Sequence, residues 1–167
     1  MTGLGRLTEG QLTAWRRFLQ AHAVLVRRLE ADLLAEHQLP LASYDVLVQL
    51  VEAPERRLRM TELAQRVLIS RSGLTRLVDR LEREGLVRRE ACDDDARGLF
   101  AVLTEDGFQR LRRAAPTHLR GVATYAMDRL DAAQVQALAE ICACLLDNVA
   151  AVPAARDGAD EPIRQPG

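Results

Sequence analysis

Two arginines and two hydroxyl side chains share one face of the segment from Ser70 to Glu84. The leucines of this segment fall on the opposite face of a helix, which leaves outward Arg71, Ser72, Thr75 and Arg76. An arginine fork can bond the O6 and N7 atoms of guanine, and hydroxyl groups can bond phosphates or base edges. Because the first turns of such a helix contact base edges when it enters the major groove end-first, the pattern predicts a DNA-contacting helix.

A second arginine falls in the polar segment 93–98, between two stretches with the composition of strands. Arg97 is expected at the tip of a hairpin, where its side chain could enter an adjacent minor groove. Asp95 could hold this arginine in position. Asp93 and Asp94 would repel phosphate, so an acidic turn with a solvated arginine remains the alternative.

The predicted DNA contacts come from both helices of a helix-turn-helix and from the hairpin tip. Arg80, further along the second helix, is expected to meet phosphate or neighbouring acids. A solvated basic helix face is the alternative for the whole set, and nothing in the pattern requires a cofactor or a metal. The candidates are Thr61, Ser70, Arg71, Ser72, Thr75, Arg76, Arg80, Asp95 and Arg97.

The surrounding residues predict the elements that position these side chains. Residues 58–67 form a two-turn helix that opens near Thr61, and Ser70 caps the start of the next helix, which ends at a left-handed Gly85. Residues 86–90 and 99–103 are expected to pair as strands. The order helix, turn, helix, hairpin predicts a winged helix-turn-helix over residues 40–104, in a mainly α fold with a small β-hairpin wing.

Helices are also predicted on both sides of this unit. A helix over residues 9–36 begins at a capping box of Thr8 and Gln11, and its narrow apolar seam fits packing against another helix. A short, packed helix follows over 43–51. The seam consists of Leu12, Trp15, Leu19, His22, Val26, Leu29 and Leu33.

Beyond the wing, Thr104 opens a helix that Pro116 either kinks or restarts. Asp131 and Gln134 repeat the capping-box spacing before a final helix, so residues 105–150 form a C-terminal helical region. The segment 151–167 has prolines, glycines and charges without periodicity, and is expected to be disordered.

Composition places the 167-residue chain among globular proteins, with 48% apolar and 28% charged residues. Its net charge is −1, yet the window from Arg56 to Arg89 holds ten arginines and four acids, about +6. No secretory signal or membrane-length apolar run is present, so a cytoplasmic location is expected. The three cysteines are expected to be reduced thiols.

The stretches LRMTELAQRVLISRSGLTRLVDRLEREGLVRRE and DDARGLFAVLTEDG resemble the helix-turn-helix and the wing of the MarR family of bacterial regulators, with the family's D-x-R pattern at Asp95 and Arg97. The resemblance runs from about Leu39 to Gly107. The long first helix with Trp15 further resembles the branch of PecS and the urate-responsive regulators. Residues 92–95 depart from the pattern, because members commonly carry a proline in the wing turn.

The resemblance implies a homodimer whose N- and C-terminal helices interleave, over residues 8–39 and 105–150. It also implies a ligand-responsive repressor that binds a pseudo-palindromic operator near its own promoter. A two-fold dimer with one recognition helix per subunit needs half-sites about 10 base pairs apart. Trp15 and His22 are the candidates for the effector pocket, and core or interface residues are the alternative for both.

Three other functions are weighed against this one. Redox sensing would need an accessible thiol, and among the cysteines only Cys92 is expected to qualify. A winged helix that serves as a protein-interaction module would be expected to lose the basic residues of its recognition helix. An enzymatic function is not supported by the sequence, because no catalytic or phosphate-binding motif is present and the three histidines are scattered along the chain.

Overall fold

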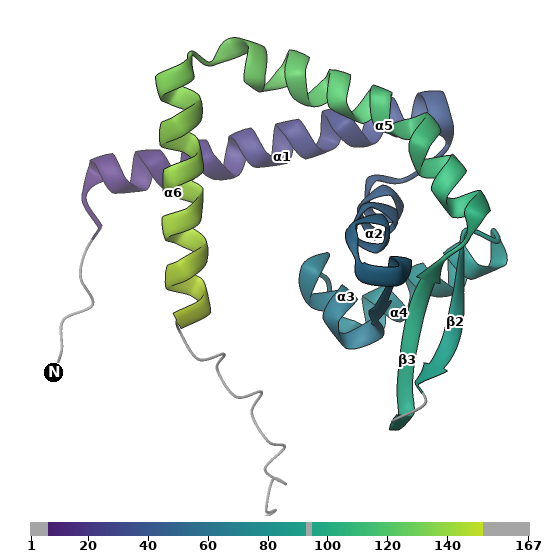
Figure 1. Ribbon diagram of the computed structural model, residues 1–167. Coiled ribbons are helices and arrows are strands. Elements are labelled where there is room, and N and C mark those ends of the chain that lie inside the picture. The colour runs from purple at the N-terminus through teal and green to yellow at the C-terminus, as the bar shows by residue number, and fades with distance from the viewer. Residues whose placement is uncertain (1–6, 93–94, 152–167) are drawn as a thin grey trace, which may run out of the picture. The chain divides into compact units, whose positions relative to one another are not determined.

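The structure is a computed structural model that describes residues 7–92 and 95–151. It is mainly helical with one small antiparallel sheet, as predicted (Figure 1). Two compact units are present: the first ends at Ala126 and the second begins at Met127. The predicted tail lies outside the described residues from 152 onward. The elements are α1 (Glu9–His37), α2 (Leu41–Glu52), η1 (Pro54–Arg56), β1 (Arg57–Arg59), α3 (Met60–Arg66), α4 (Arg71–Arg83), β2 (Val87–Cys92), β3 (Asp95–Leu103), α5 (Glu105–Tyr125), η2 (Met127–Arg129) and α6 (Ala132–Ala151).

Side-chain caps set the predicted helix starts. Thr8 Oγ1 accepts from Gln11 N (3.2 Å) while Gln11 Oε1 accepts from Thr8 N (2.8 Å), which completes the capping box of α1. Thr104 Oγ1 accepts from Gly107 N (3.0 Å) at the start of α5. Asp131 and its partner three residues on form the same box before α6. These predictions are confirmed.

The apolar core of the first unit joins α2, α3 and α4 to the sheet. Leu47 and Leu50 of α2, Leu63 of α3 and Leu81 of α4 are fully buried together. Each such leucine stabilises the fold by roughly 1.5–3 kcal/mol relative to exposure. The buried face of α4 therefore fixes which of its faces remains outside.

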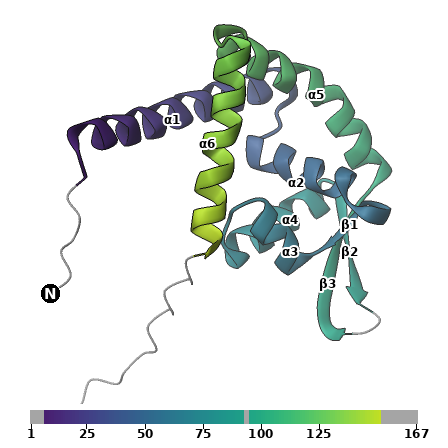
Figure 2. The same ribbon diagram turned by 60° about the vertical axis from the view of Figure 1, so that its left-hand side comes forward.

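The sheet has the strand order β1-β3-β2, with both pairs antiparallel. Strand β1 was not predicted: it is three residues long, and Leu58 at its centre pairs with Ala101 of β3. The other two strands are longer than the predicted 86–90 and 99–103, because pairing continues to Cys92 and Asp95 beyond an irregularity after Ala91. Figure 2 shows the resulting hairpin projecting beyond α3 and α4.

Helix α5 runs along the C-terminal part of α1 (Figure 1). A side chain at Gly121 would lie 2.7 Å from Leu29 Cδ2, so the glycine permits this close approach. Thr117 Oγ1 donates to Glu36 Oε2 (2.7 Å), and this bond, with one from Arg120, lowers the pKa of that carboxyl. The helix continues through Pro116 without the restart that the sequence left open.

Candidate nucleic-acid interface

Helix α4 begins at Ser70, whose Oγ accepts from Gly73 N (3.1 Å) as predicted for the cap. A Cβ on Gly73 would lie 3.0 Å from Ser70 Oγ. The glycine thus leaves room for the cap that orients the start of the helix.

The first two turns of α4 present four polar side chains to solvent, namely Arg71, Ser72, Thr75 and Arg76. Thr75 Oγ1 donates to Arg71 O (3.0 Å), which leaves its oxygen free to accept. Within the described part of the chain, neither arginine of this group forms an ion pair or a side-chain hydrogen bond. Both guanidinium groups are therefore available to an external acceptor.

Arg80 lies one turn further along and contacts the fold instead. Its Nη2 donates to Ser43 Oγ of α2 (2.7 Å), and its Nε lies 4.0 Å from Glu84. Ser43 is only 1% exposed, so this bond satisfies a buried hydroxyl. The sequence placed Arg80 among the DNA contacts, and the bond to α2 gives it a structural partner that the local pattern did not reveal.

Arg89 of β2 ties the wing to α4, and it was not among the predicted residues. Its guanidinium bonds Glu82 Oε2 (2.5 Å), Asp79 Oδ1 (2.6 Å) and Thr75 O (3.3 Å), while its backbone N donates to Glu82 Oε1 (3.0 Å). The side chain is 19% exposed. The spacing of Asp79 and Glu82, which places two acids on one helix face, was the signal that could have indicated an arginine partner.

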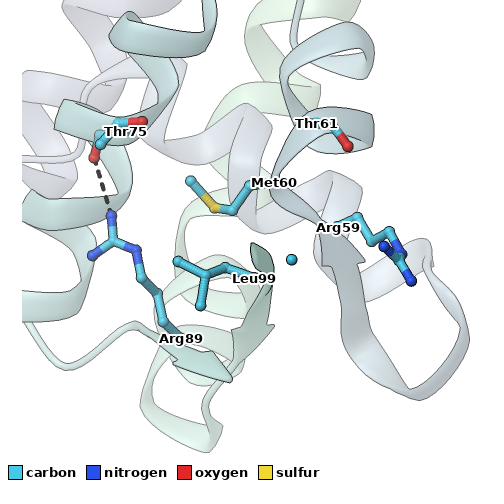
Figure 3. Close-up of a pocket in the computed structure, with 7 residues that line it drawn as sticks. Arg59, Met60, Thr61, Thr75, Arg89 and Leu99 are labelled. Atoms are coloured by element: carbon cyan, nitrogen blue, oxygen red, sulfur yellow. Dashed lines mark hydrogen bonds between the residues drawn. The ribbon is translucent and has the colours of Figure 1, made fainter. Parts of the chain in front are cut away.

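A cavity of about 250 Å³ lies between the start of α3, α4 and the wing (Figure 3). It brings Thr61, a predicted site residue on α3, together with Thr75 on α4. Figure 3 shows Thr75 and Arg89 joined by a hydrogen bond at one side of it. The lining residues are Arg59, Met60, Thr61, Thr75, Arg89, Gly98 and Leu99.

The two predicted wing residues, Asp95 and Arg97, fall within β3, so their backbone belongs to the strand rather than to a turn. Extended pairing of the hairpin accounts for this difference from the prediction. Their side chains are outside the described part of the structure, as are Asp93 and Asp94 entirely. The minor-groove contact of Arg97 therefore stays a prediction.

Comparison with known proteins identifies the family of this chain. The family profile described as MarR family matches residues 37–98. Sco3205 of Streptomyces coelicolor, a MarR family transcriptional regulator solved in complex with DNA, is 41% identical. Its TM-score is 0.83, over 95% of this chain and 98% of that one. The chain belongs to the MarR family.

Two curated proteins extend the comparison of this MarR-family chain. YetL of Bacillus subtilis, an HTH-type transcriptional repressor, is 36% identical over 75 residues, which are 45% of each chain. PecS of Dickeya dadantii, an HTH-type transcriptional regulator, is 27% identical over 99 residues, 58% of this chain and 59% of PecS. These relatives are transcription regulators and not enzymes.

Trp15 and His22, the candidate pocket residues, lie on the exposed surface of α1. Trp15 is 52% exposed and stacks on Phe18, with ring centroids 5.9 Å apart. Further along the apolar seam, Leu19 and Val26 are also exposed, while Leu33 is fully buried. The first half of this seam therefore lacks a covering partner within the described residues of the first unit.

The accessibility of Cys92 differs from what the sequence suggested. Cys92 is buried, with 6% of its surface exposed, so it lacks the accessibility that redox sensing requires. Cys142 and Cys144 lie on α6, where the single chain leaves them half-buried and exposed; their burial at a dimer interface stays a prediction. No helix of the described residues has the length and apolar character needed to cross a membrane.

Proposed function

We propose that this MarR-family chain is a sequence-specific DNA-binding transcription regulator that places the start of α4 in the major groove. The observation that carries the proposal is the unpaired, exposed state of Arg71 and Arg76 within the described residues. An unpaired fork can bond guanine or phosphate without first breaking an internal ion pair. The DNA complex of the relative Sco3205 supports the same function.

The proposed working unit is a homodimer. The exposed side chains Trp15, Phe18, Leu19 and Val24 give α1 an apolar surface that a monomer would leave in water. In the second unit, α6 separately exposes Val135, Ile141 and Leu145. A two-fold partner would cover such surfaces and place a second α4 about one helical turn of DNA away, which fits a pseudo-palindromic operator.

Repression released by a small effector is the proposed mode of action. The repressor name of YetL supports the first part. For the second, the cavity beside Thr75 and Arg89 touches both α4 and the wing, so an occupant that favours a different spacing of the two would weaken DNA binding. Trp15 and His22 would face an effector only where a second chain completes a pocket over them.

PecS supports the narrower branch assignment less than Sco3205 supports the family, with 27% against 41% identity. The effector is therefore proposed at the level of the family, without commitment to urate. A thermal-shift screen against aromatic acids, urate, purines and antibiotics identifies it, and any compound that raises the unfolding temperature is then tested for release of DNA. A regulator of this kind acts on chromosomal DNA, so we place it in the cytoplasm.

The function is tested by binding to the DNA upstream of its own gene. Fluorescence anisotropy compares that duplex with a scrambled duplex of equal length at two salt concentrations, with an Arg71→Ala/Arg76→Ala variant as control. We expect wild type to prefer the upstream duplex, to weaken steeply as salt rises, and to lose the preference in the variant. Equal binding of both duplexes, or no complex, would contradict the proposal and favour a protein-interaction module.

A further inference from the structure

Leu68 has the largest exposed fraction, 86%, among the large apolar side chains of the described residues. It lies in the turn between α3 and α4. Its neighbours Val67 and Ile69 are half-buried and pack against the core, so the turn holds Leu68 alone in solvent. The leucine gains almost nothing from burial in the folded chain.

The backbone at Leu68 is also unfavourable for a leucine, with φ at +56°. Helix α3 ends with Ile69 N donating to Ala64 O (3.2 Å) and Leu68 N donating to Gln65 O (3.4 Å). This pair of bonds is the Schellman motif, whose left-handed residue is usually glycine because a Cβ is strained there. Leu68 occupies that left-handed position.

Helix α4 ends in the same motif with the usual residue. Leu86 N donates to Leu81 O (2.9 Å), Gly85 N donates to Glu82 O (3.0 Å), and Gly85 has φ +72°. The two helix ends thus place a glycine and a leucine in equivalent positions. Because folding alone favours glycine at both, the leucine at 68 calls for a role outside the folded monomer.

The position of Leu68 indicates that role, and the inference rests on the proposed function. Only two residues separate it from Arg71, the first residue of α4, so this exposed side chain lies a few residues from the predicted base contacts along the chain. In the major groove, the C5-methyl group of thymine is recognised by contact with apolar side chains. A methyl group offers no donor or acceptor, so a hydrogen-bonding side chain cannot recognise it. We propose that Leu68 contacts a thymine methyl group at the edge of each half-site and so contributes to sequence specificity.

Deoxyuridine, which is thymine without the methyl group, gives the direct test. The probe is a duplex selected by the wild-type protein from a random-sequence pool, and its thymines are replaced one at a time by deoxyuridine. We expect wild type to lose roughly fourfold in affinity per half-site at one position, the effect of one buried methyl group. Leu68→Ala and Leu68→Gly should bind the thymine duplex more weakly than wild type by the same factor. Replacing that thymine by deoxyuridine should not change the affinity of either variant.

Stability separates this role from a structural one. Leu68→Gly relieves the left-handed strain, so we expect its unfolding temperature to rise by about 2–4 °C while its DNA affinity falls. Leu119→Ala, which removes another exposed leucine on α5, is the matched control and should leave DNA affinity unchanged.

Two results would overturn the inference. The first is that Leu68→Gly binds the thymine duplex as tightly as wild type does. The second is that the Leu68 variants lose as much affinity as wild type when thymine is replaced by deoxyuridine. If Arg76→Ala weakens binding while the Leu68 variants do not, only the role of Leu68 fails. If wild type selects no duplex, the proposed function fails, and this inference fails with it.

Discussion

The two halves of α4 carry the same kind of side chain in different surroundings. In the first half, Arg71 and Arg76 point to solvent with no ion pair among the described residues. In the second half, Arg80 bonds Ser43 and Arg83 Nε donates to Asp79 O (3.2 Å). The same basic composition thus divides into a half that is free for an external partner and a half that fixes the helix in the domain.

The second half also holds the wing in place. Arg89 reaches from β2 to Asp79 and Glu82, so the hairpin is anchored mainly to the second half of α4, with one longer bond to the carbonyl oxygen of Thr75. Variants of the two halves should therefore differ in which property they change. Changes in the first half should weaken DNA binding without loss of stability, whereas changes in the second half should lower stability with a smaller effect on DNA binding.

The largest effect is expected for Arg76→Ala. Loss of one bidentate contact costs about 1–3 kcal/mol, and a dimer loses it in both half-sites. Operator affinity is measured by fluorescence anisotropy, and urea unfolding should be unchanged because the side chain is exposed. Arg83→Ala, on the same helix, is the control and should lose less than half as much binding energy. Equal losses for both would remove the distinction between the halves.

Arg89→Ala should destabilise the domain by about 2 kcal/mol, because a largely buried guanidinium loses charged hydrogen bonds to two partly exposed acids. The free energy of unfolding in urea measures this. Arg88→Ala is the matched control: Arg88 is the preceding residue on β2, is exposed, and within the described residues pairs with Glu90. If the two variants unfold alike, Arg89 does not anchor the wing.

Arg80→Ala should cost about 1–2 kcal/mol of stability, because the buried Ser43 hydroxyl loses its partner. A double-mutant cycle with Ser43→Ala isolates the contribution of this bond. We expect operator affinity to fall much less than in Arg76→Ala. A stable variant with equally weak DNA binding would instead make Arg80 a DNA contact, as the sequence predicted.

Gly85→Ala, at the end of the second half, should destabilise by about 1 kcal/mol. The cause is conformational, because φ is +72° and an added Cβ would meet nothing within 4 Å. Thermal unfolding measures the change. Leu68→Gly tests the equivalent end of α3 and should change stability in the opposite direction, so a shift of the same sign in both would contradict the role assigned to the left-handed position.

Local signals in the sequence predicted most of the fold. Caps at Thr8, Ser70, Thr104 and Asp131 placed the starts of α1, α4, α5 and α6 within a residue, because each cap depends on side chains only three positions apart. The left-handed Gly85 was predicted for the same reason. The leucine periodicity likewise identified which face of α4 is buried.

Long-range contacts were beyond the reach of those signals. The bond from Arg80 to Ser43 spans 37 residues, and β1 exists only because it pairs with β3. The strain at Leu68 depends on a turn whose geometry the packing of α3 and α4 decides, since the sequence shows an ordinary apolar run there. The sequence alone therefore could not distinguish the arginines that are free to contact DNA from those that bond other parts of the fold.

The most direct test of the division within α4 is a base-preference profile. Each position of a selected half-site is changed in turn, and the affinities of wild type, Arg71→Ala, Arg76→Ala and Arg83→Ala are measured at constant salt. We expect the first two variants to lose preference at one or two positions per half-site while Arg83→Ala keeps the wild-type profile. Wild-type profiles in Arg71→Ala and Arg76→Ala would show that the start of α4 does not contact the bases.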